Sequence, residues 1–382
     1  MPRGLEQGLG ALLTLVILLD VFLTVLYARM GTGLVAPWVA RLTWAVFRAA
    51  SKPFGRWRGK VLSFCGPAIL VLLLGVWAIG LALGAGLVIH PALGSGVKTS
   101  SGHTPTDFVT AFFAGGSSLA IVGAGDFSPG TSAYRLLYLF NSLVGVSVTS
   151  LTLTYLMQVY TALRARNALG FKVHLQSGET GDAAELLAGW VPEGELSGGY
   201  NNLSAMAEEM SSVKEAHHFY PVLFYFRFPA PYYSVSRFTL VTLDAVSLLR
   251  SALDDEKAGW MKESAAVEQL GRAALILATS LGKGFVPGGV SEETEPDATE
   301  KERWRRRYAA AVRRLRQAGA PVTDDERAGA ETYLALRARW YPHVATLAPA
   351  GGYSPGDVDP AGYDPEASDR RPDFRGRRRA AL

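Results

Sequence analysis

Two glycines one residue apart, Gly123 and Gly125, lie in the segment Ile121-Val122-Gly123-Ala124-Gly125-Asp126. Glycine lacks a Cβ atom and therefore reaches backbone conformations in which successive carbonyl oxygens face one axis. Rings of such carbonyls can replace the water molecules around a bare cation inside a membrane pore. The chemistry that this segment offers is therefore cation coordination, without any covalent step.

The residues before this segment favour a short helix that does not cross a membrane. The sequence Thr104-Pro105-Thr106-Asp107 provides a cap and an early acid, which suit the amino end of a helix. The apolar stretch Phe108–Val122 that follows is too short for a hydrocarbon core of about 30 Å. Because it is rich in glycine and serine, we expect a re-entrant element buried within protein.

Three longer apolar stretches have the roughly 20 residues that a membrane-spanning helix needs. They are Leu9–Ala28, Val61–Ile89 and Ala133–Leu163. Nearly all long apolar runs of the 382 residues lie before residue 165, and the charged residues crowd into the part that follows. The sequence therefore predicts an all-α membrane protein with three transmembrane helices, a re-entrant pore helix and filter loop, and a cytoplasmic helical domain.

At residues 61–163 the chain resembles the two-helix pore module of the bacterial potassium-channel and ion-channel superfamily. That pattern runs from an outer helix through a pore helix and a filter to a GD-x-x-P exit, and then to an inner helix with a hinge glycine. Asp126 and Pro129 match the exit, and Gly145 lies 19 residues after Asp126, at the position of the hinge.

The resemblance implies roles for individual residues. The ion filter would be formed by the backbone carbonyls of Ile121, Val122, Gly123, Ala124 and Gly125. Filter support would come from Asp126, Phe113 and Ser117. The inner helix would supply a hinge and a cavity lining through Gly145, Ser142, Thr149, Thr152 and Met157. A helix that packs on small residues would show a similar polar stripe, so simple packing is an equal alternative for the last four.

Two filter positions depart from the family pattern, and both concern selectivity. The family's tyrosine is Ala124 here, so the aromatic side chain that braces the filter is missing. The family's threonine is Ile121, which has no hydroxyl group to bind the innermost ion. Backbone carbonyls remain at both positions, so a potassium preference and a weakly selective cation channel are both open.

One pore segment per chain implies four chains around one axis, so a homotetramer is expected. We expect no enzyme and no cofactor beyond a permeant potassium ion, because no residue set resembles a catalytic or metal site. Nucleic acid is not an expected partner, since the chain is anchored in a membrane. The alternative from another functional class is a non-conducting membrane scaffold or sensor that has channel architecture.

Residues 29–60 are basic and contain no acidic residue, which predicts a cytoplasmic loop. The amino terminus would then lie outside a multi-pass cell membrane protein and the carboxy-terminal domain inside. Helical spacing of apolar residues in this loop suits a helix in the headgroup region that contacts anionic lipids, although a plain hairpin is an alternative. The basic residues are Arg29, Arg41, Arg48, Lys52, Arg56, Arg58 and Lys60.

A carboxylate inside the first span, Asp20, is costly in lipid and is a functional candidate by default. Alternatively, a neighbouring helix or Thr24 satisfies Asp20, which then only aids assembly. The sequence leaves both open.

The sequence predicts four domains. Residues 1–60 hold the first span and the basic loop, and residues 61–165 form the pore domain. Residues 166–348 form a mainly helical cytoplasmic domain, and residues 349–382 form a disordered tail. The aromatic segment Pro221–Tyr233 is open as a strand, a packed loop or a membrane-facing patch. Helices of the third domain are expected at Ala183–Trp190, Leu203–Phe219, Ser234–Leu253, Met261–Leu281, Glu300–Gln317 and Asp324–Trp340.

Overall fold

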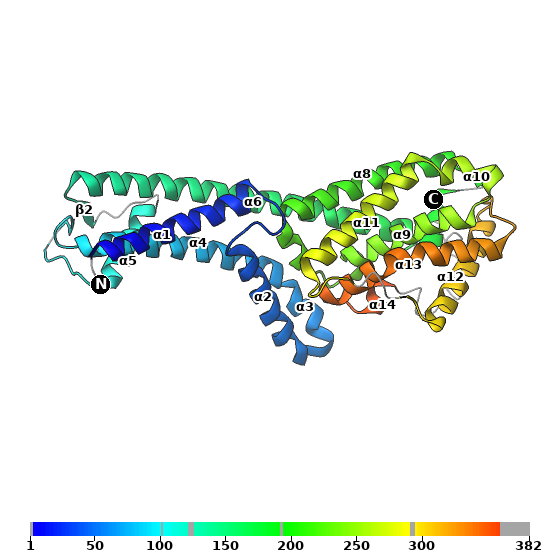
Figure 1. Ribbon diagram of the computed structural model, residues 1–382, viewed down its shortest axis with the longest axis horizontal. Coiled ribbons are helices and arrows are strands. Elements are labelled where there is room, and N and C mark those ends of the chain that lie inside the picture. The colour runs from blue at the N-terminus through cyan, green and yellow to red at the C-terminus, as the bar shows by residue number, and fades with distance from the viewer. Residues whose placement is uncertain (1–2, 101, 121–125, 192–193, 291–294, 360–382) are drawn as a thin grey trace, which may run out of the picture. The chain divides into compact units, whose positions relative to one another are not determined.

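The computed structural model describes residues 3–100, 102–120, 126–191, 194–290 and 295–359 (Figure 1). These residues are mainly helical, and the strands among them are three residues long. They fall into two compact units, each described by itself below. The membrane unit takes residues from 1–50, 64–161 and 218–225, and the helical unit takes residues from 51–63, 162–217 and 226 onward. The all-α fold class is confirmed.

Three helical stretches are long and apolar enough to cross a membrane: Arg3–Leu26, Cys65–Ala92 and Ser132–Gln176. The first consists of α1 (Arg3–Val21) and a π-helical turn, η1 (Phe22–Leu26). The second consists of α4 (Cys65–Ile89) and the short η3 (His90–Ala92). The third is α6 (Ser132–Gln176), which continues beyond the expected end at Leu163 because no proline or glycine cap stops it there.

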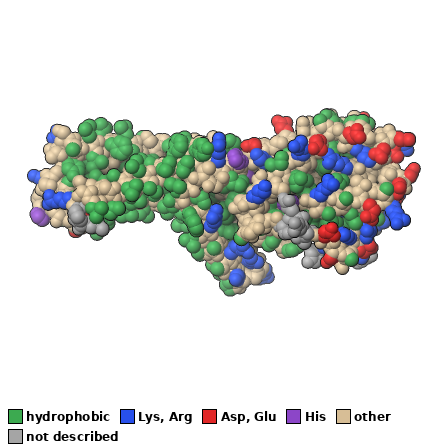
Figure 2. All heavy atoms as spheres, viewed as in Figure 1, with side chains coloured by type: hydrophobic (Ala, Val, Ile, Leu, Met, Phe, Trp, Pro, Cys, Tyr) green, Lys and Arg blue, Asp and Glu red, His purple; other side chains and the backbone are tan. Residues whose placement is uncertain are grey.

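Two shorter helices also belong to the membrane unit. The first, α2 (Ala36–Ser51), forms within the basic loop, as its helical spacing predicts. The second, α5 (Phe108–Leu119), is the short apolar helix before the glycine-rich segment. Figure 2 shows mainly hydrophobic side chains over α1 and α6, whereas charged side chains gather over α8 and α10 to α13.

A small antiparallel sheet lies beside α5. Its strands are β1 (Val97–Thr99) and β2 (Phe127–Pro129), and Lys98 pairs with Ser128 at the centre. The sequence did not predict this sheet, because three-residue strands lack a readable alternation of apolar and polar residues.

Helices of the helical unit follow the predicted blocks with shifted ends. The predicted helix Met261–Leu281 is wrong as a single element, because Ser264 accepts a hydrogen bond from the Val267 N–H and starts a new helix there. The other blocks are present. The helices are α3 (Arg58–Ser63), α7 (Ala183–Trp190), α8 (Ser197–Phe219), α9 (Val235–Ala252), α10 (Asp255–Lys262), α11 (Ala265–Phe285), α12 (Ala298–Gln317), α13 (Glu326–Ala350) and α14 (Pro355–Val358), with 3₁₀ turns η2 (Lys52–Trp57) and η6 (Pro231–Tyr233). The 3₁₀ turn η5 (Pro221–Tyr225) belongs to the membrane unit.

Residues 349–359 are packed, so the predicted disordered tail is wrong over this part. Helix α13 runs to Ala350, and Tyr353, Val358 and Asp359 are buried. The rest of the predicted tail lies outside the described residues. In the aromatic segment, the two 3₁₀ turns exclude a strand, and Leu223, Tyr225 and Phe226 are buried, which supports a packed loop.

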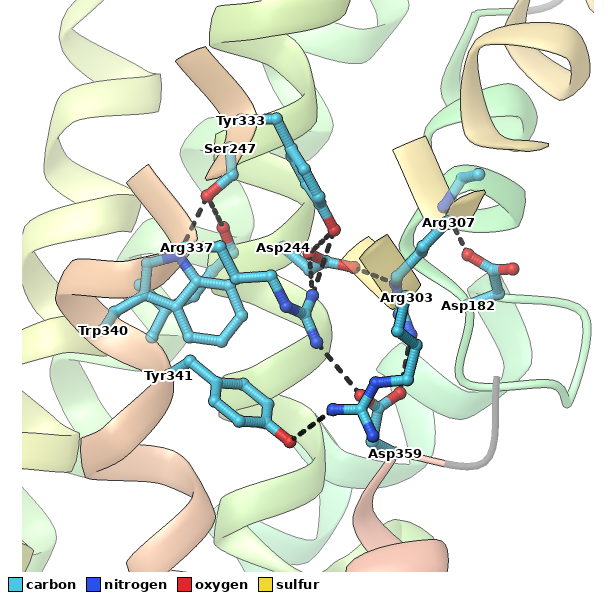
Figure 3. Close-up of polar contacts among 12 residues, drawn as sticks. Asp182, Asp244, Ser247, Arg303, Arg307, Tyr333, Arg337, Trp340, Tyr341 and Asp359 are labelled. Carbon is cyan, nitrogen blue, oxygen red and sulfur yellow. Dashed lines mark hydrogen bonds and ion pairs between the residues drawn. The ribbon is translucent and has the colours of Figure 1, made fainter. Parts of the chain in front are cut away.

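A buried cluster of charges holds the helical unit together (Figure 3). Asp244 on α9 accepts hydrogen bonds from Arg307 Nε at 2.8 Å, from Arg337 Nη1 and from the Tyr333 hydroxyl at 2.5 Å. Asp359 accepts from Arg307 Nη1 at 2.6 Å and from Arg337 Nη2 at 3.0 Å. Two carboxylates thus neutralise two guanidinium groups and join α9, α12, α13 and the end of the described chain.

Aromatic rings surround the guanidinium group of Arg337. Its Cζ atom lies 5.0 Å from the ring centres of Trp340 and Tyr341 and 5.3 Å from that of Trp304. Burial works against the charge of Arg337, but Asp244 and Asp359 outweigh burial, so the pKa of Arg337 is raised above its ordinary value. Arg337 therefore stays charged.

Unlike Arg337, His217 on α8 is kept uncharged by burial. Its Nδ1–H donates to the Val213 carbonyl at 2.9 Å, while Nε2 is buried without a partner. Desolvation, followed by the nearby positive charge of Arg166, lowers the pKa of His217 from 6.5 to about 3. The folded helical unit therefore takes up a proton here only in strong acid.

We expect the helical unit to lose stability as the pH falls below about 6.5, because the unfolded chain protonates His217 there and the folded chain does not. The loss should be about 2 kcal/mol at pH 5, since each pH unit contributes about 1.4 kcal/mol. Denaturant unfolding of the full-length protein at pH 7 and pH 5 measures it. His217→Gln should reduce the pH dependence by this amount, and His218→Gln, its half-exposed neighbour, should not. Equal slopes in the two variants would contradict the assignment.

Candidate ion pore

Helix α5 starts with a firm cap. Asp107 accepts hydrogen bonds from the Thr110 N–H at 3.0 Å and from the Thr110 hydroxyl at 2.7 Å. These two bonds hold the pKa of Asp107 below its usual value. The sequence predicted a cap followed by an early acid, and in the structure that acid, Asp107, is itself the N-cap residue.

A histidine connects the start of α5 to α1. His90 Nδ1 lies 2.5 Å from Glu6 Oε1, and its Nε2 lies 3.2 Å from the Thr106 carbonyl oxygen. The ring also packs edge-on against Phe108, the first residue of α5. The beginning of α5 is therefore fixed from two sides.

Small residues let α5 lie directly against the backbone of α4. A Cβ atom on Gly115 would come within 2.4 Å of the Gly86 nitrogen. Neither helix could keep its position if Gly115 carried a side chain, since contacts below 3.0 Å force the backbone to move.

The carboxyl end of α5 is held against α6. Asn141 on α6 donates from Nδ2 to the Ser118 hydroxyl at 2.9 Å, and both side chains are buried. One turn further along α6, a Cβ atom on Gly145 would lie 1.8 Å from the Leu119 carbonyl oxygen. Gly145 thus permits a close helix contact within a continuous α6.

The chain after the glycine-rich segment is fixed to the residue that follows β1. The Asp126 carbonyl accepts a hydrogen bond from the Ser100 N–H at 2.8 Å. Phe127 then enters β2, and its ring meets the ring of Phe113 at a centroid distance of 6.0 Å. Helix α5 and β2 therefore flank the segment 121–125 with defined positions.

A cavity of about 320 Å³ lies where α4, the end of α5 and α6 meet. Of the predicted inner-helix residues, Gly145, Thr149 and Thr152 line it, together with Trp77 and Leu119. The Thr149 hydroxyl donates to the Gly145 carbonyl at 2.8 Å, so it is satisfied within α6. The cavity lies within one chain and its walls are mainly apolar.

The structure brings some predicted site residues together and separates others. Ile121, Val122, Gly123, Ala124 and Gly125 lie outside the described residues. The Ser117 hydroxyl donates to the Phe113 carbonyl, the Asp126 side chain is exposed, and Ser142 and Met157 are outside the cavity lining. In the described part of the chain, no group of three His, Cys, Asp or Glu side chains could hold a metal ion.

The structure identifies the partners of Asp20. Asp20 is fully buried, and its Oδ1 accepts from the N–H groups of Leu34 at 2.6 Å and Val35 at 2.7 Å, just before α2. Its Oδ2 accepts from Trp77 Nε1 at 2.8 Å. Asp20 therefore joins α1, α4 and the start of α2, and Thr24 is not its partner.

Sequence reasoning missed the contact between Asn141 and Ser118. An amide in a mainly apolar span was a usable signal, because such side chains hydrogen-bond between membrane helices. The partner could not be named, since Ser117 and Ser118 are equally placed in the sequence.

Comparisons with known proteins support membrane placement only. No protein-family model matches the sequence, and no solved structure matches it. A curated relative is "Uncharacterized membrane protein YdjJ" of Bacillus subtilis (strain 168), which is 23% identical over 164 residues, or 43% of this chain and 47% of that protein. The chain thus spans about half the length of the curated relative that it matches. The name of that relative and the three apolar helices indicate a membrane protein.

Proposed function

We propose that this chain is one subunit of a homotetrameric, potassium-channel-like pore that conducts cations passively, with its filter at residues 121–125. The observation that carries the proposal is the frame around this segment. A short capped helix, α5, packs against the backbones of α4 and α6 and ends at Leu119, and the chain resumes at Asp126 and β2. This order of elements fits the pore module that the sequence resembles.

The frame accounts for how a filter could be held without the missing tyrosine. Asn141 fixes the carboxyl end of α5, and the bond from the Ser100 N–H fixes the Asp126 carbonyl. The Phe113 and Phe127 rings add an aromatic contact beside the segment. Of the possible selectivities, we propose a preference for potassium. In this proposal the amino terminus is extracellular, and the helical unit is cytoplasmic and assembles or gates the tetramer. The protein catalyses no reaction.

Weak selectivity is the second candidate, and it rests on Ala124 and Ile121. A filter without the bracing ring and the inner hydroxyl could adapt to sodium as well as potassium, because carbonyl number and flexibility both influence selectivity. A non-conducting scaffold or sensor is the third candidate.

Ion flux from liposomes that contain the full-length protein separates these candidates. Flux under a potassium gradient but not a sodium gradient supports the first, and equal flux under both supports the second. Absence of flux from a particle whose mass is that of a tetramer would favour the scaffold. Gly123→Val should silence any flux, because its side chain restricts the backbone that presents the carbonyls. Flux that survives this change would place the ion path elsewhere.

A further inference from the structure

The basic segment, residues Ser51–Ser63, exposes aromatic rings among positive charges. Phe54 and Trp57 are 51% and 49% exposed. Every cation of the basic segment is exposed as well, namely Lys52, Arg56, Arg58 and Lys60. The sequence contains no acidic residue between Asp20 and Asp107 that could neutralise them locally.

Cations and rings in the basic segment are arranged around Trp57. Lys60 Nζ lies 4.1 Å from the centre of the Trp57 ring, and Arg56 Cζ lies 5.7 Å from it. Tryptophan prefers the interface between water and lipid, and each lysine or arginine near an anionic leaflet is attracted to it. A single surface with both properties fits phospholipid headgroups.

The position of the basic segment in the chain brings it to a bilayer. Helix α4 starts at Cys65, two residues after the segment ends, and is apolar enough to cross a membrane. At about 1.5 Å per helical residue, Lys60 lies roughly 10 Å or less from the start of that span. This distance is comparable to the Debye length in physiological salt, so the charges interact with a lipid surface there.

Helix α2, which precedes the basic segment, has a matching character. Trp38 and Leu42 are each 69% exposed, and Arg41 Cζ lies 5.8 Å from the Trp38 ring centre. Exposed apolar side chains of this size need a cover, and a bilayer interface provides one for an amphipathic helix with a basic face.

Arg227 connects the basic segment to the carboxy-terminal end of the described chain. Its Nη1 donates to the Gly59 carbonyl at 2.9 Å, and its Nε donates to the Gly352 carbonyl at 3.1 Å. The guanidinium also stacks over the Tyr353 ring at 4.5 Å. The segment is therefore held by residues of the helical unit, so a ligand that holds the segment also restrains Gly352 and Tyr353 through Arg227.

We propose that the basic segment binds the anionic phospholipid headgroups of the bilayer and that Arg227 couples this binding to the end of the helical unit. The inference rests on the membrane placement of α4 and is independent of ion conduction. Charge complementarity selects anionic over zwitterionic lipid, and the exposed rings select a lipid surface over a soluble anion.

The first test counts bound lipid by native mass spectrometry of the full-length protein from phosphatidylcholine membranes that contain phosphatidylglycerol. The variant K52Q/R56Q/R58Q/K60Q should retain less phosphatidylglycerol than the wild type by a factor of about ten or more, because four favourable charges are removed. The control variant R272Q/R306Q/R313Q/R316Q removes four exposed charges from α11 and α12 and should retain the wild-type amount. Equal losses in both variants, or no loss in either, would overturn the proposal. Displacement of the lipid by inorganic phosphate would also overturn it, in favour of a soluble anion.

The second test measures the coupling by hydrogen exchange. In the wild type, the amides of Gly352 and Tyr353 should be better protected in membranes with phosphatidylglycerol than in phosphatidylcholine alone. Arg227→Gln should still retain the lipid but lose this difference, while protection of α9 stays unchanged and reports a folded unit. If the lipid-dependent protection persists in Arg227→Gln, Arg227 does not carry the coupling.

Discussion

Replacing Asp244 by asparagine should lower the stability of the helical unit by about 4 kcal/mol, because two buried arginines would then share one carboxylate. Asp244 is fully buried and binds Arg307, Arg337 and Tyr333. The amide keeps the shape of the side chain but not its charge, so the cost is that of an uncompensated guanidinium in a site closed to water.

Hydrogen exchange in the full-length protein measures this effect without isolating the unit. Protection of the α9 amides should fall roughly a thousandfold, since every 1.4 kcal/mol changes the opening equilibrium tenfold. Asp255→Asn is the matched control, because Asp255 pairs with Lys262 at 2.5 Å while its side chain is 87% exposed. Exposed pairs contribute at most about 1 kcal/mol, so the control should hardly change protection. Equal effects of the two substitutions would show that the buried cluster does not stabilise the unit.

Local signals in the sequence predicted the helices well. Helix α7 has the predicted bounds, because Asp182 caps its first turn through the Ala184 N–H and the apolar spacing after it is regular. The three spans followed from the length and hydropathy of their segments. The split between α10 and α11 was missed because the apolar spacing continues across Ser264 and hides the cap.

Contacts between distant residues could not be predicted from those signals. Asp359 follows a segment rich in proline, glycine and aspartate, a composition that predicts disorder. Its order comes instead from Arg307 and Arg337, which lie 52 and 22 residues earlier. Similarly, the sequence marked Asp20 as costly, but its partners at Leu34 and Val35 depend on a turn of the chain between α1 and α2.

In the candidate pore, too, the sequence predicted a position and only the structure supplied the contact made there. The resemblance placed Gly145 at the hinge of the inner helix, on spacing alone. The structure adds a neighbour at that position, since the Leu119 carbonyl of α5 lies against the Gly145 backbone. A requirement for glycine therefore has two explanations, bending and close approach, and they predict different results for one substitution.

Gly145→Ala should destabilise the membrane unit by about 3 kcal/mol, because the new methyl group would lie 1.8 Å from the Leu119 carbonyl oxygen. That neighbour is backbone at the end of α5 and cannot rotate away. Helices α5 and α6 must separate, and the bond between Asn141 and Ser118 then stretches as well. We expect a lower unfolding temperature in detergent, together with loss of any tetramer and of any ion flux.

Gly75→Ala is the matched control for this change, because Gly75 also lies in a spanning helix, α4, and a Cβ atom there meets nothing within 4 Å. It should leave stability unchanged or raise it slightly, since alanine is the better helix former. A hinge without a packing role gives a different pattern, in which Gly145→Ala unfolds at the same temperature as Gly75→Ala and changes only the flux. Close approach predicts that stability falls first and that flux is lost with it, so unfolding temperature and flux measured on both variants decide which property of glycine α6 requires.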